Sequence, residues 1–408
     1  MLNVGSDGTS ETLHEYLGLP KAMSVDQRGR EPVMLSKPSL PTLDRLAPYL
    51  SMIDKARFYT NGGALHDLLR ERLARHCQVD EAQLGLAGSG TVAIIGLLLG
   101  VGGRAGVERP LCVCPSYTFS ATLCAAEACG YAPYLVDIDP HSWALDPATV
   151  EALPDFDRVG AVLVVAPYGR PLDLSAWRDF MHRTGRVVVV DAAAGFDSLS
   201  YEAIIASEVP VAMSLHATKT LSTAEGGLML CADRQVMRRA AAALNFGFDT
   251  QRESVIPGMN GKISEYHAAI GLAELDGWPC KRASFVLTAS IYAMRAELDA
   301  LEDQVRVNTR CASPYALFVA QDAAEADAVA IEFAAERIEW RRWYGHGLHM
   351  HPAYARYHRT ALPVTMDVAH RVIGLPFSTD LPTPDIDRVV HAINRARTNM
   401  ENARRRAM

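Results

Sequence analysis

The chain has 408 residues, of which 49% are hydrophobic and 21% are charged, and its formal net charge at pH 7 is −7. This composition is typical of a globular protein with a large core, and roughly 100–200 residues per domain predicts two or three domains. The negative charge argues against a nucleic-acid-binding protein, and the longest apolar run, residues 92–101, is too short to span a membrane.

Helices and strands are predicted to alternate from about residue 64. Apolar residues at helical spacing predict helices over 65–76, 91–99, 118–130 and 174–185. Short apolar runs predict strands over 111–114, 134–138, 160–167, 186–193, 209–215 and 226–232. This alternation predicts an α/β fold, with a three-layer α/β/α large domain around a mostly parallel central sheet.

The character of the chain changes after about residue 285. A long helical pattern covers 285–301, and shorter mixed elements and a segment rich in Trp, Tyr and His follow it. We therefore expect an N-terminal extension over 1–32, a large domain over 33–284, and a smaller α+β C-terminal domain over 285–408.

The eight cysteines are scattered and contain no C-x-x-C pair. Zinc sites and disulfide scaffolds use characteristic cysteine spacings, so we expect neither, and no metal site of another kind is indicated. The first residues also lack the basic and apolar regions of a signal peptide. A cytoplasmic protein is the simplest expectation.

Four features fall near predicted strand ends, where the site of such a sheet lies. The turn G-S-G-T-V at 88–92 opens a helix whose N-terminus could bind phosphate, or is an ordinary capped turn. Asp191 ends the run V-V-V-V-D and could keep a pyridine nitrogen protonated, or could cap the next turn. Lys219 lies in a loop of small polar residues and could attack an aldehyde, although most loop lysines are simply solvated. Phe119 follows a strand and could stack on a flat ring, or pack in the core.

These four features occur along the chain in the order expected of a pyridoxal-phosphate (PLP) enzyme: the phosphate-binding turn, the aromatic residue, the aspartate and the lysine. Three longer segments carry a resemblance to one family of such enzymes. Residues 214–227, S-L-H-A-T-K-T-L-S-T-A-E-G-G, are similar to S-F-H-x-x-K-x-x-x-x-x-E-G-G. Residues 260–275, N-G-K-I-S-E-Y-H-A-A-I-G-L-A-E-L, and 166–174, A-P-Y-G-R-P-L-D-L, match two further motifs. From about residue 33 to residue 395 the chain resembles the DegT/DnrJ/EryC1/StrS sugar aminotransferases, which are fold-type I enzymes of the aspartate aminotransferase superfamily.

The resemblance implies a role for each matching position. Lys219 would hold the cofactor as a Schiff base and move protons during catalysis. Asp191 would pair with the ring nitrogen, and Phe119 would stack on the ring. Ser214 and the backbone amides near the start of the helix would hold the phosphate, namely those of Gly90, Thr91 and Val92.

The same resemblance implies a homodimer with shared active sites. In the family, an asparagine of the neighbouring subunit also reaches the phosphate, and Asn260 is the matching residue in this chain.

Three positions depart from the family pattern. The family has Gln or His three residues after the aspartate, close to the cofactor, and Ala194 stands here. A contact to the cofactor is therefore missing or is supplied from elsewhere. Ala64 replaces a proline, and Arg70 replaces a glutamate. These changes bear on the substrate more than on the chemistry.

The implied function is transfer of an amino group from an amino acid, with glutamate as the expected donor, to a keto sugar. A nucleotide-linked 4-keto-6-deoxy sugar is the leading substrate. A keto-cyclitol or another small ketone is an alternative acceptor. A sugar dehydratase that uses pyridoxamine phosphate is a further alternative, although those relatives carry histidine in place of the lysine, and so is a non-catalytic PLP-binding regulator. Arg341 and Arg342 could meet a diphosphate, or could be surface charges.

Overall fold

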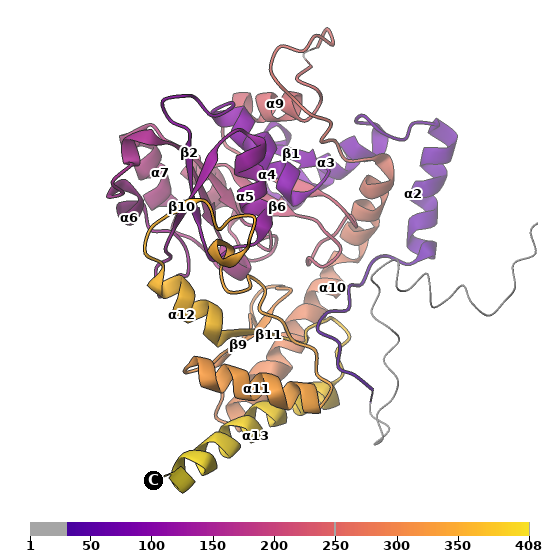
Figure 1. The fold of residues 1–408 in the computed structure, drawn as a ribbon. Helices are drawn as coiled ribbons and strands as arrows, with labels where there is room; N and C mark the ends of the chain where they lie inside the picture. The colour runs from indigo at the N-terminus through magenta and orange to yellow at the C-terminus, as the bar shows by residue number, and fades with distance from the viewer. Residues whose placement is uncertain (1–30, 249, 408) are drawn as a thin grey trace, which may run out of the picture.

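The computed structural model describes residues 31–248 and 250–407, so all but the last two residues of the expected N-terminal extension lie outside the described residues (Figure 1). Its central feature is a sheet with the strand order β1-β7-β6-β5-β4-β2-β3-β10. The strands are β1 (Leu84–Ala87), β2 (Leu111–Pro115), β3 (Ala132–Val136), β4 (Val159–Val165), β5 (Val187–Asp191), β6 (Val211–Ser214), β7 (Gly227–Leu230) and β10 (His358–Arg359).

The central sheet is mostly parallel, as predicted. The run from β6 through β5, β4, β2 and β3 to β10 pairs in parallel throughout. Only β7 runs against its neighbours β6 and β1. Because β7 is antiparallel to both, β1 has the same direction as the parallel strands, and its C-terminal end lies at the same edge of the sheet.

Both faces of this sheet are covered by helices. Along β5, Val188 and Val190 are buried in one hydrophobic cluster and Val189 is buried in the other, as the two-residue repeat of a strand requires. One cluster includes apolar residues of α4 (Gly90–Val101), α5 (Ser120–Ala128) and α9 (Arg234–Ala243). The other includes residues of α2 (Leu43–Ala56), α3 (Ala64–Cys77), α6 (Pro147–Glu151), α7 (Leu174–Thr184), α8 (Tyr201–Ser207) and α10 (Glu265–Leu298). The predicted three-layer α/β/α arrangement is confirmed.

A smaller α+β part is built from the C-terminal third of the chain. Its antiparallel sheet has the order β11-β9-β8, with β8 (Val305–Arg306), β9 (Ala316–Val319) and β11 (Val372–Leu375). Packed with it are α11 (Ala323–Ala335), α12 (Pro363–Arg371) and α13 (Thr383–Ala407), and Figure 1 shows this part below the central sheet. Short 3-10 turns occur at η1 (Glu81–Gln83), η2 (Phe156–Arg158), η3 (Pro167–Gly169) and η4 (Leu348–Met350).

The two parts are joined at several places, so the division at residue 284 stays a prediction. Residue 284 lies inside α10, which continues through it from one part to the other. Strand β10, from the C-terminal third, pairs with β3 of the central sheet. At the other end of the chain, Val33 bridges to Ile338 and Ser36 bridges to Phe377.

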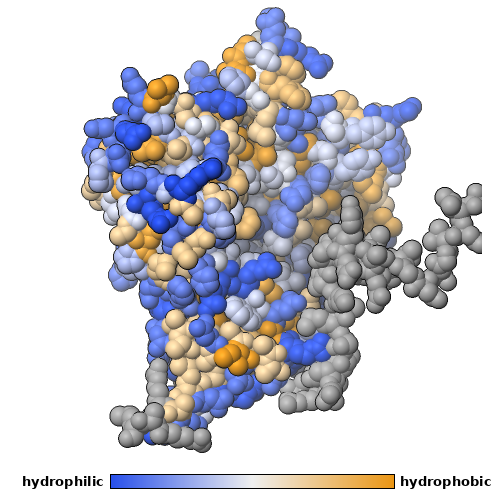
Figure 2. Space-filling model, viewed as in Figure 1, coloured by the Kyte–Doolittle hydropathy of each residue, from blue (hydrophilic) through white to orange (hydrophobic). Residues whose placement is uncertain are grey.

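Residues 245–248 and 250–260 leave the body of the protein next to α9, at the top of Figure 1. Bridges between Asn245 and Asn260 and between Phe248 and Ser254 hold the two arms of this projecting segment together. Over the face drawn in Figure 2, hydrophobic and hydrophilic residues are interspersed. None of the described helices is long and apolar enough to cross a bilayer.

Candidate active site

A cavity of about 370 Å³ lies at the C-terminal edge of the central sheet. Its walls come from the start of α4, from the loops after β2, β4, β5 and β6, and from Tyr315, Arg341, Trp343 and Tyr344 of the C-terminal part. Six of the eight predicted site residues line this cavity: Gly90, Thr91, Phe119, Asp191, Ser214 and Lys219. Residues far apart in the chain are thus brought together where a doubly wound sheet places its ligands.

The start of α4 is shaped to receive an anion. Ser89 caps the helix, and its Oγ accepts a hydrogen bond of 3.2 Å from the N–H of Val92. The amide of Val92, predicted to hold phosphate, is therefore already bonded within the protein. The N–H groups of Gly90 and Thr91 lie in the first turn, where a helix provides no carbonyl partner. These two amides are the ones in position to bind a phosphate.

Gly90 permits a close contact between this helix and the end of β6. A Cβ atom at Gly90 would lie 2.9 Å from the Cβ of Ser214, a distance that real side chains do not reach. The Oγ of Ser214 accepts a hydrogen bond from the N–H of His216 at 3.2 Å. The absence of a side chain at Gly90 therefore places the Ser214 hydroxyl beside the helix N-terminus.

Asp191 presents a buried carboxylate to the cavity, with only 6% of its surface exposed. One oxygen, Oδ2, accepts from the Thr122 hydroxyl at 2.8 Å, and Oδ1 accepts from the N–H of Ala193 at 3.2 Å. Burial raises the pKa of Asp191, while Thr122, the amide of Ala193 and the charge of Lys219 lower it in part. Such a carboxylate gains most from a cationic group bound in the cavity.

Lys219 lies in an ordered turn and is partly buried. Its N–H donates to the carbonyl of His216 at 2.8 Å, and the N–H of Ala217 donates to the carbonyl of Ala224 at 2.8 Å. The side-chain Nζ donates a 3.0 Å hydrogen bond to the hydroxyl of Tyr315. The amine is therefore held at the cavity wall, in contrast to the freely solvated loop lysine that remained an alternative in the sequence.

Phe119 and Ala194 complete the cavity wall that the sequence indicated. Phe119 is 63% exposed, lines the cavity and occupies the N-cap position of α5. Ala194 is buried and offers only a methyl group, so its side chain can donate no hydrogen bond to a ligand.

Several cavity residues were not identified from the sequence. The hydroxyls of Thr118 and Thr122 are 2.8 Å apart, which extends the hydrogen bonds of Asp191 from the first turns of α5 to the loop before this helix. The four-residue spacing of these threonines on a predicted helix was a usable signal. Tyr315 comes from the smaller α+β part, where nothing in the pattern marked it.

An aromatic wall closes one side of the cavity. Tyr168 stacks on Tyr344 with ring centroids 4.8 Å apart, and its hydroxyl lies 2.8 Å from that of Tyr117. Burial raises the pKa of Tyr168 well above its ordinary value, so this hydroxyl stays protonated at neutral pH. The wall therefore presents aromatic rings and neutral hydroxyl groups to a ligand.

The structure separates the two arginines that the sequence paired. Arg341 lines the cavity. Arg342 instead forms an ion pair of 3.1 Å with Asp327 and donates to the carbonyl of His370. The prediction that both could meet a diphosphate is thus restricted to Arg341, because the guanidinium of Arg342 is engaged within the protein.

Asn260 does not line the cavity of its own chain. It is exposed at the base of the projecting segment, and its Oδ1 accepts from the Lys262 amine at 2.7 Å. Its expected contact with a phosphate in a partner subunit stays a prediction. Within residues 31–248 and 250–407, no group of three or more His, Cys, Asp or Glu residues is placed to hold a metal ion.

The fold and this cavity define a class of proteins: α/β proteins in which a helix N-terminus, a lysine and a buried carboxylate meet in a cavity at the sheet edge. Residues 44–394 match the model of the DegT/DnrJ/EryC1/StrS aminotransferase family, and the chain belongs to this family. The resemblance inferred from the three motifs is confirmed.

Relatives and solved structures agree with this assignment. Protein Rv3402c of Mycobacterium tuberculosis is 30% identical over 381 residues, covering 90% of each chain. The dTDP-4-amino-4,6-dideoxy-D-glucose transaminase of Shigella dysenteriae is 31% identical over 247 residues, which cover 60% of this chain and 65% of that enzyme. Among solved structures, DesI in the presence of its TDP-sugar product superposes with a TM-score of 0.79 at 27% identity, covering 96% of this chain and 98% of DesI.

Proposed function

We propose that this aminotransferase uses PLP to move an amino group from an amino acid, with glutamate as the donor, to a nucleotide-linked keto sugar. A 4-keto-6-deoxy sugar is the leading acceptor. The observation that carries the proposal is the meeting of Lys219, Asp191 and the first turn of α4 around one cavity. The names of the relatives support the substrate class, since the Shigella enzyme is a dTDP-sugar transaminase and DesI was solved with a TDP-sugar product.

The described residues fit PLP. The amides of Gly90 and Thr91 and the hydroxyl of Ser214 would hold its phosphate at the N-terminus of α4. Asp191 would hold a protonated ring nitrogen, whose positive charge offsets the cost of burying this carboxylate. When bound, PLP supplies an aldehyde that captures amines and a ring that withdraws electrons.

The residues of the chain supply the positioning and the proton transfer. The amine of Lys219 is the candidate group that would take a proton from the substrate carbon bearing the nitrogen and pass it to the cofactor, and would reverse this transfer when the ketone is aminated. Tyr315 orients that amine through its 3.0 Å hydrogen bond. The buried ring of Tyr168 and its stacking partner Tyr344 limit the access of water to the same region.

The proposal includes a homodimer in which the partner subunit's Asn260 reaches the phosphate. Supporting it, Asn260 is exposed and lies outside the cavity of its own chain. Large apolar side chains are also exposed near the cavity mouth and on the projecting segment, where Phe119 is 63%, Phe246 is 45% and Val255 is 59% exposed. Covering such residues in a subunit interface is favourable.

The test begins with the protein loaded with PLP. Addition of glutamate should change the visible absorbance to that of the pyridoxamine form and release 2-oxoglutarate in equal amount. Nucleotide-linked 4-keto and 3-keto sugars, and keto-cyclitols, are then offered as acceptors. A protein that binds PLP but shows no spectral change with any amino donor would contradict the aminotransferase proposal and favour a regulator.

A further inference from the structure

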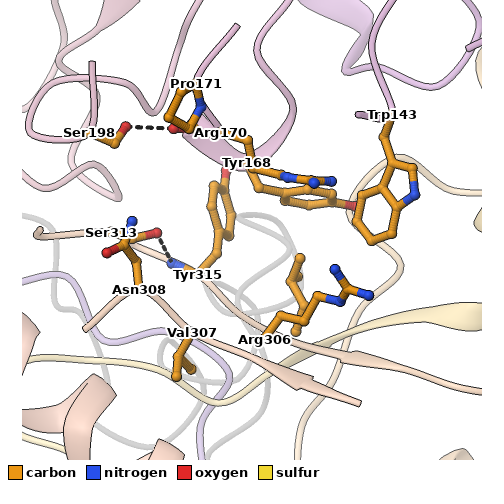
Figure 3. Close-up of a pocket in the computed structure, with 12 residues that line it drawn as sticks. Trp143, Tyr168, Arg170, Pro171, Ser198, Arg306, Val307, Asn308, Ser313 and Tyr315 are labelled. Atoms are coloured by element: carbon orange, nitrogen blue, oxygen red, sulfur yellow. Dashed lines mark hydrogen bonds between the residues drawn. The ribbon is translucent and has the colours of Figure 1, made fainter. Parts of the chain in front are cut away.

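A second cavity, of about 180 Å³, lies beside the first and shares the side chains of Tyr168 and Tyr315 with it (Figure 3). Three of its lining residues come from separate places in the chain. Trp143 lies in the loop after β3, Arg170 lies in the loop after β4, and Arg306 lies in β8 of the small sheet. The cavity therefore lies between the two parts of the molecule, next to the proposed active site.

Backbone geometry directs Arg170 into this cavity. Tyr168 and Gly169 both have positive φ values, 57° and 76°, and turn the chain sharply after β4. A Cβ at Gly169 would lie 2.4 Å from the carbonyl oxygen of Ala194, so only glycine allows this turn to pack there. The turn is thus fixed by its contact with Ala194, the third residue after Asp191.

The guanidinium of Arg170 is only partly satisfied. Its Nη2 donates to the carbonyl of His141 at 3.0 Å. Its Nη1 is buried and has no hydrogen-bond partner among the residues that the structure describes. A buried donor without an acceptor is costly, so a bound ligand that supplied an acceptor here would remove this cost.

A second guanidinium converges on the same place. The Cζ atom of Arg170 lies 4.9 Å from the ring centroid of Trp143, and that of Arg306 lies 5.7 Å from it. In Figure 3 both guanidinium groups point toward the indole. Burial lowers the pKa of Arg170, and the positive charge of Arg306 lowers it further. In the part of the chain that the structure describes, no carboxylate forms an ion pair with either arginine.

We infer that Arg170 and Arg306 bind the diphosphate of a nucleotide-linked substrate, an inference that rests on the proposed function. Two guanidinium groups supply two planar forks of donors, which suit two phosphoryl groups. The bound anion would give the buried Nη1 of Arg170 an acceptor and would relieve the repulsion between the two cations.

The position of the cavity also favours a diphosphate over the carboxylate of the amino donor. The side chain of Tyr315 lies between the two cavities, with its hydroxyl against the Lys219 amine. The α-carboxylate of an amino acid is bonded to the reacting carbon itself and stays beside Lys219. In a nucleotide-linked sugar, the sugar ring separates the reacting carbon from the diphosphate, which allows the anion to lie beyond Tyr315.

The experiment uses the PLP-loaded protein, so that the anion site at the start of α4 is filled. Inorganic pyrophosphate, dTDP and 2-oxoglutarate are titrated separately by isothermal calorimetry into wild type, Arg170→Gln and Arg306→Gln. Arg238→Gln, an exposed position on α9, is the control for a lost positive charge. We expect each cavity variant to weaken pyrophosphate and dTDP about tenfold or more, with 2-oxoglutarate unchanged.

Three results would overturn the inference. These are a wild type that binds neither pyrophosphate nor dTDP, variants that bind both as tightly as wild type, and variants that lose 2-oxoglutarate but keep dTDP. Arg306 is exposed, so Arg306→Gln carries the test even if Arg170→Gln fails to fold. Uptake of PLP and 2-oxoglutarate release are measured on the same samples. Their failure contradicts the proposed function, whereas a failure confined to the diphosphate titrations contradicts only this site.

Discussion

The amine of Lys219 donates a 3.0 Å hydrogen bond to the hydroxyl of Tyr315, although the two residues are 96 positions apart. Lys219 lies in the turn between β6 and β7, and Tyr315 immediately precedes β9 of the small sheet. This bond joins the proposed catalytic group to the other part of the molecule. The orientation of the amine therefore depends on how the two parts sit together.

Tyr315→Phe tests whether this bond matters for turnover. It removes the hydroxyl but keeps the ring, so we expect the fold to be unchanged and the turnover number to fall about tenfold, the effect of losing one hydrogen bond of ordinary strength. Steady-state kinetics with the amino donor and the keto sugar measure it. Tyr49→Phe, which removes a hydroxyl bonded to Asp276, is the control. Equal rates for Tyr315→Phe and wild type would show that catalysis by Lys219 does not depend on its hydrogen bond to the smaller α+β part.

Lys219→Ala tests the proposed catalytic lysine. We expect the variant to lose covalent attachment of PLP and all measurable turnover while keeping a wild-type circular dichroism spectrum, because a partly buried loop side chain contributes little to the core. Lys55→Ala, at an exposed position on α2, should behave as wild type. If Lys219→Ala aminates the ketone at a near wild-type rate, another group performs the proton transfer.

Asp191→Asn tests the electrostatic role of the buried carboxylate. Asparagine has nearly the same shape but no negative charge, so a protonated ring nitrogen would lose its partner. We expect weaker PLP binding and loss of most of the rate. Equilibrium titration of PLP against the unloaded protein gives the affinity, and the glutamate half-reaction gives the rate. Full activity would remove the carboxylate from the mechanism.

Asp191 also gives a prediction of pH dependence in the unloaded protein. Because burial raises its pKa in the folded state, the folded chain binds this proton more tightly than the unfolded chain. The resulting stability is present below the ordinary carboxyl pKa of about 4 and is lost as the pH rises through the raised value. The free energy of unfolding of wild type, measured relative to that of Asp191→Asn, should therefore fall as the pH rises from the ordinary carboxyl pKa through the raised pKa of Asp191.

In Thr122→Val, the decrease in the free energy of unfolding should continue to higher pH than in wild type. Its hydroxyl lowers the pKa of Asp191, so removing it allows burial to raise the pKa further. Thr122→Ser keeps a hydroxyl and should restore the wild-type profile. Urea unfolding of the unloaded proteins at several pH values measures both. Parallel profiles for Thr122→Val and wild type would show that the hydroxyl does not influence the carboxylate.

Much of the site could be predicted because its parts follow strands that the sequence marks clearly. The run V-V-V-V-D predicts both β5 and the exit of Asp191 at the sheet edge, and G-S-G predicts the start of α4. Tyr315 could not be found in this way, because its contact with Lys219 arises only when the two parts pack together. The free Nη1 of Arg170 likewise depends on tertiary burial, which no local pattern encodes. Asn260 lies outside the cavity of its own chain, so its predicted role still depends on a second subunit.

Gly90→Ala tests the close approach on which the phosphate site depends. The new Cβ would lie 2.9 Å from the Cβ and 3.2 Å from the Cα of Ser214, and a backbone neighbour cannot move aside as a flexible side chain can. We expect a loss of about 1–3 kcal/mol in the free energy of unfolding, as for other overpacked sites, together with weaker PLP binding. Gly106→Ala is the matched control, because a Cβ there meets nothing within 4 Å. Denaturant unfolding and PLP titration of both variants separate the two effects. If Gly90→Ala binds PLP as tightly as Gly106→Ala does, the contact between Gly90 and Ser214 does not shape the phosphate site.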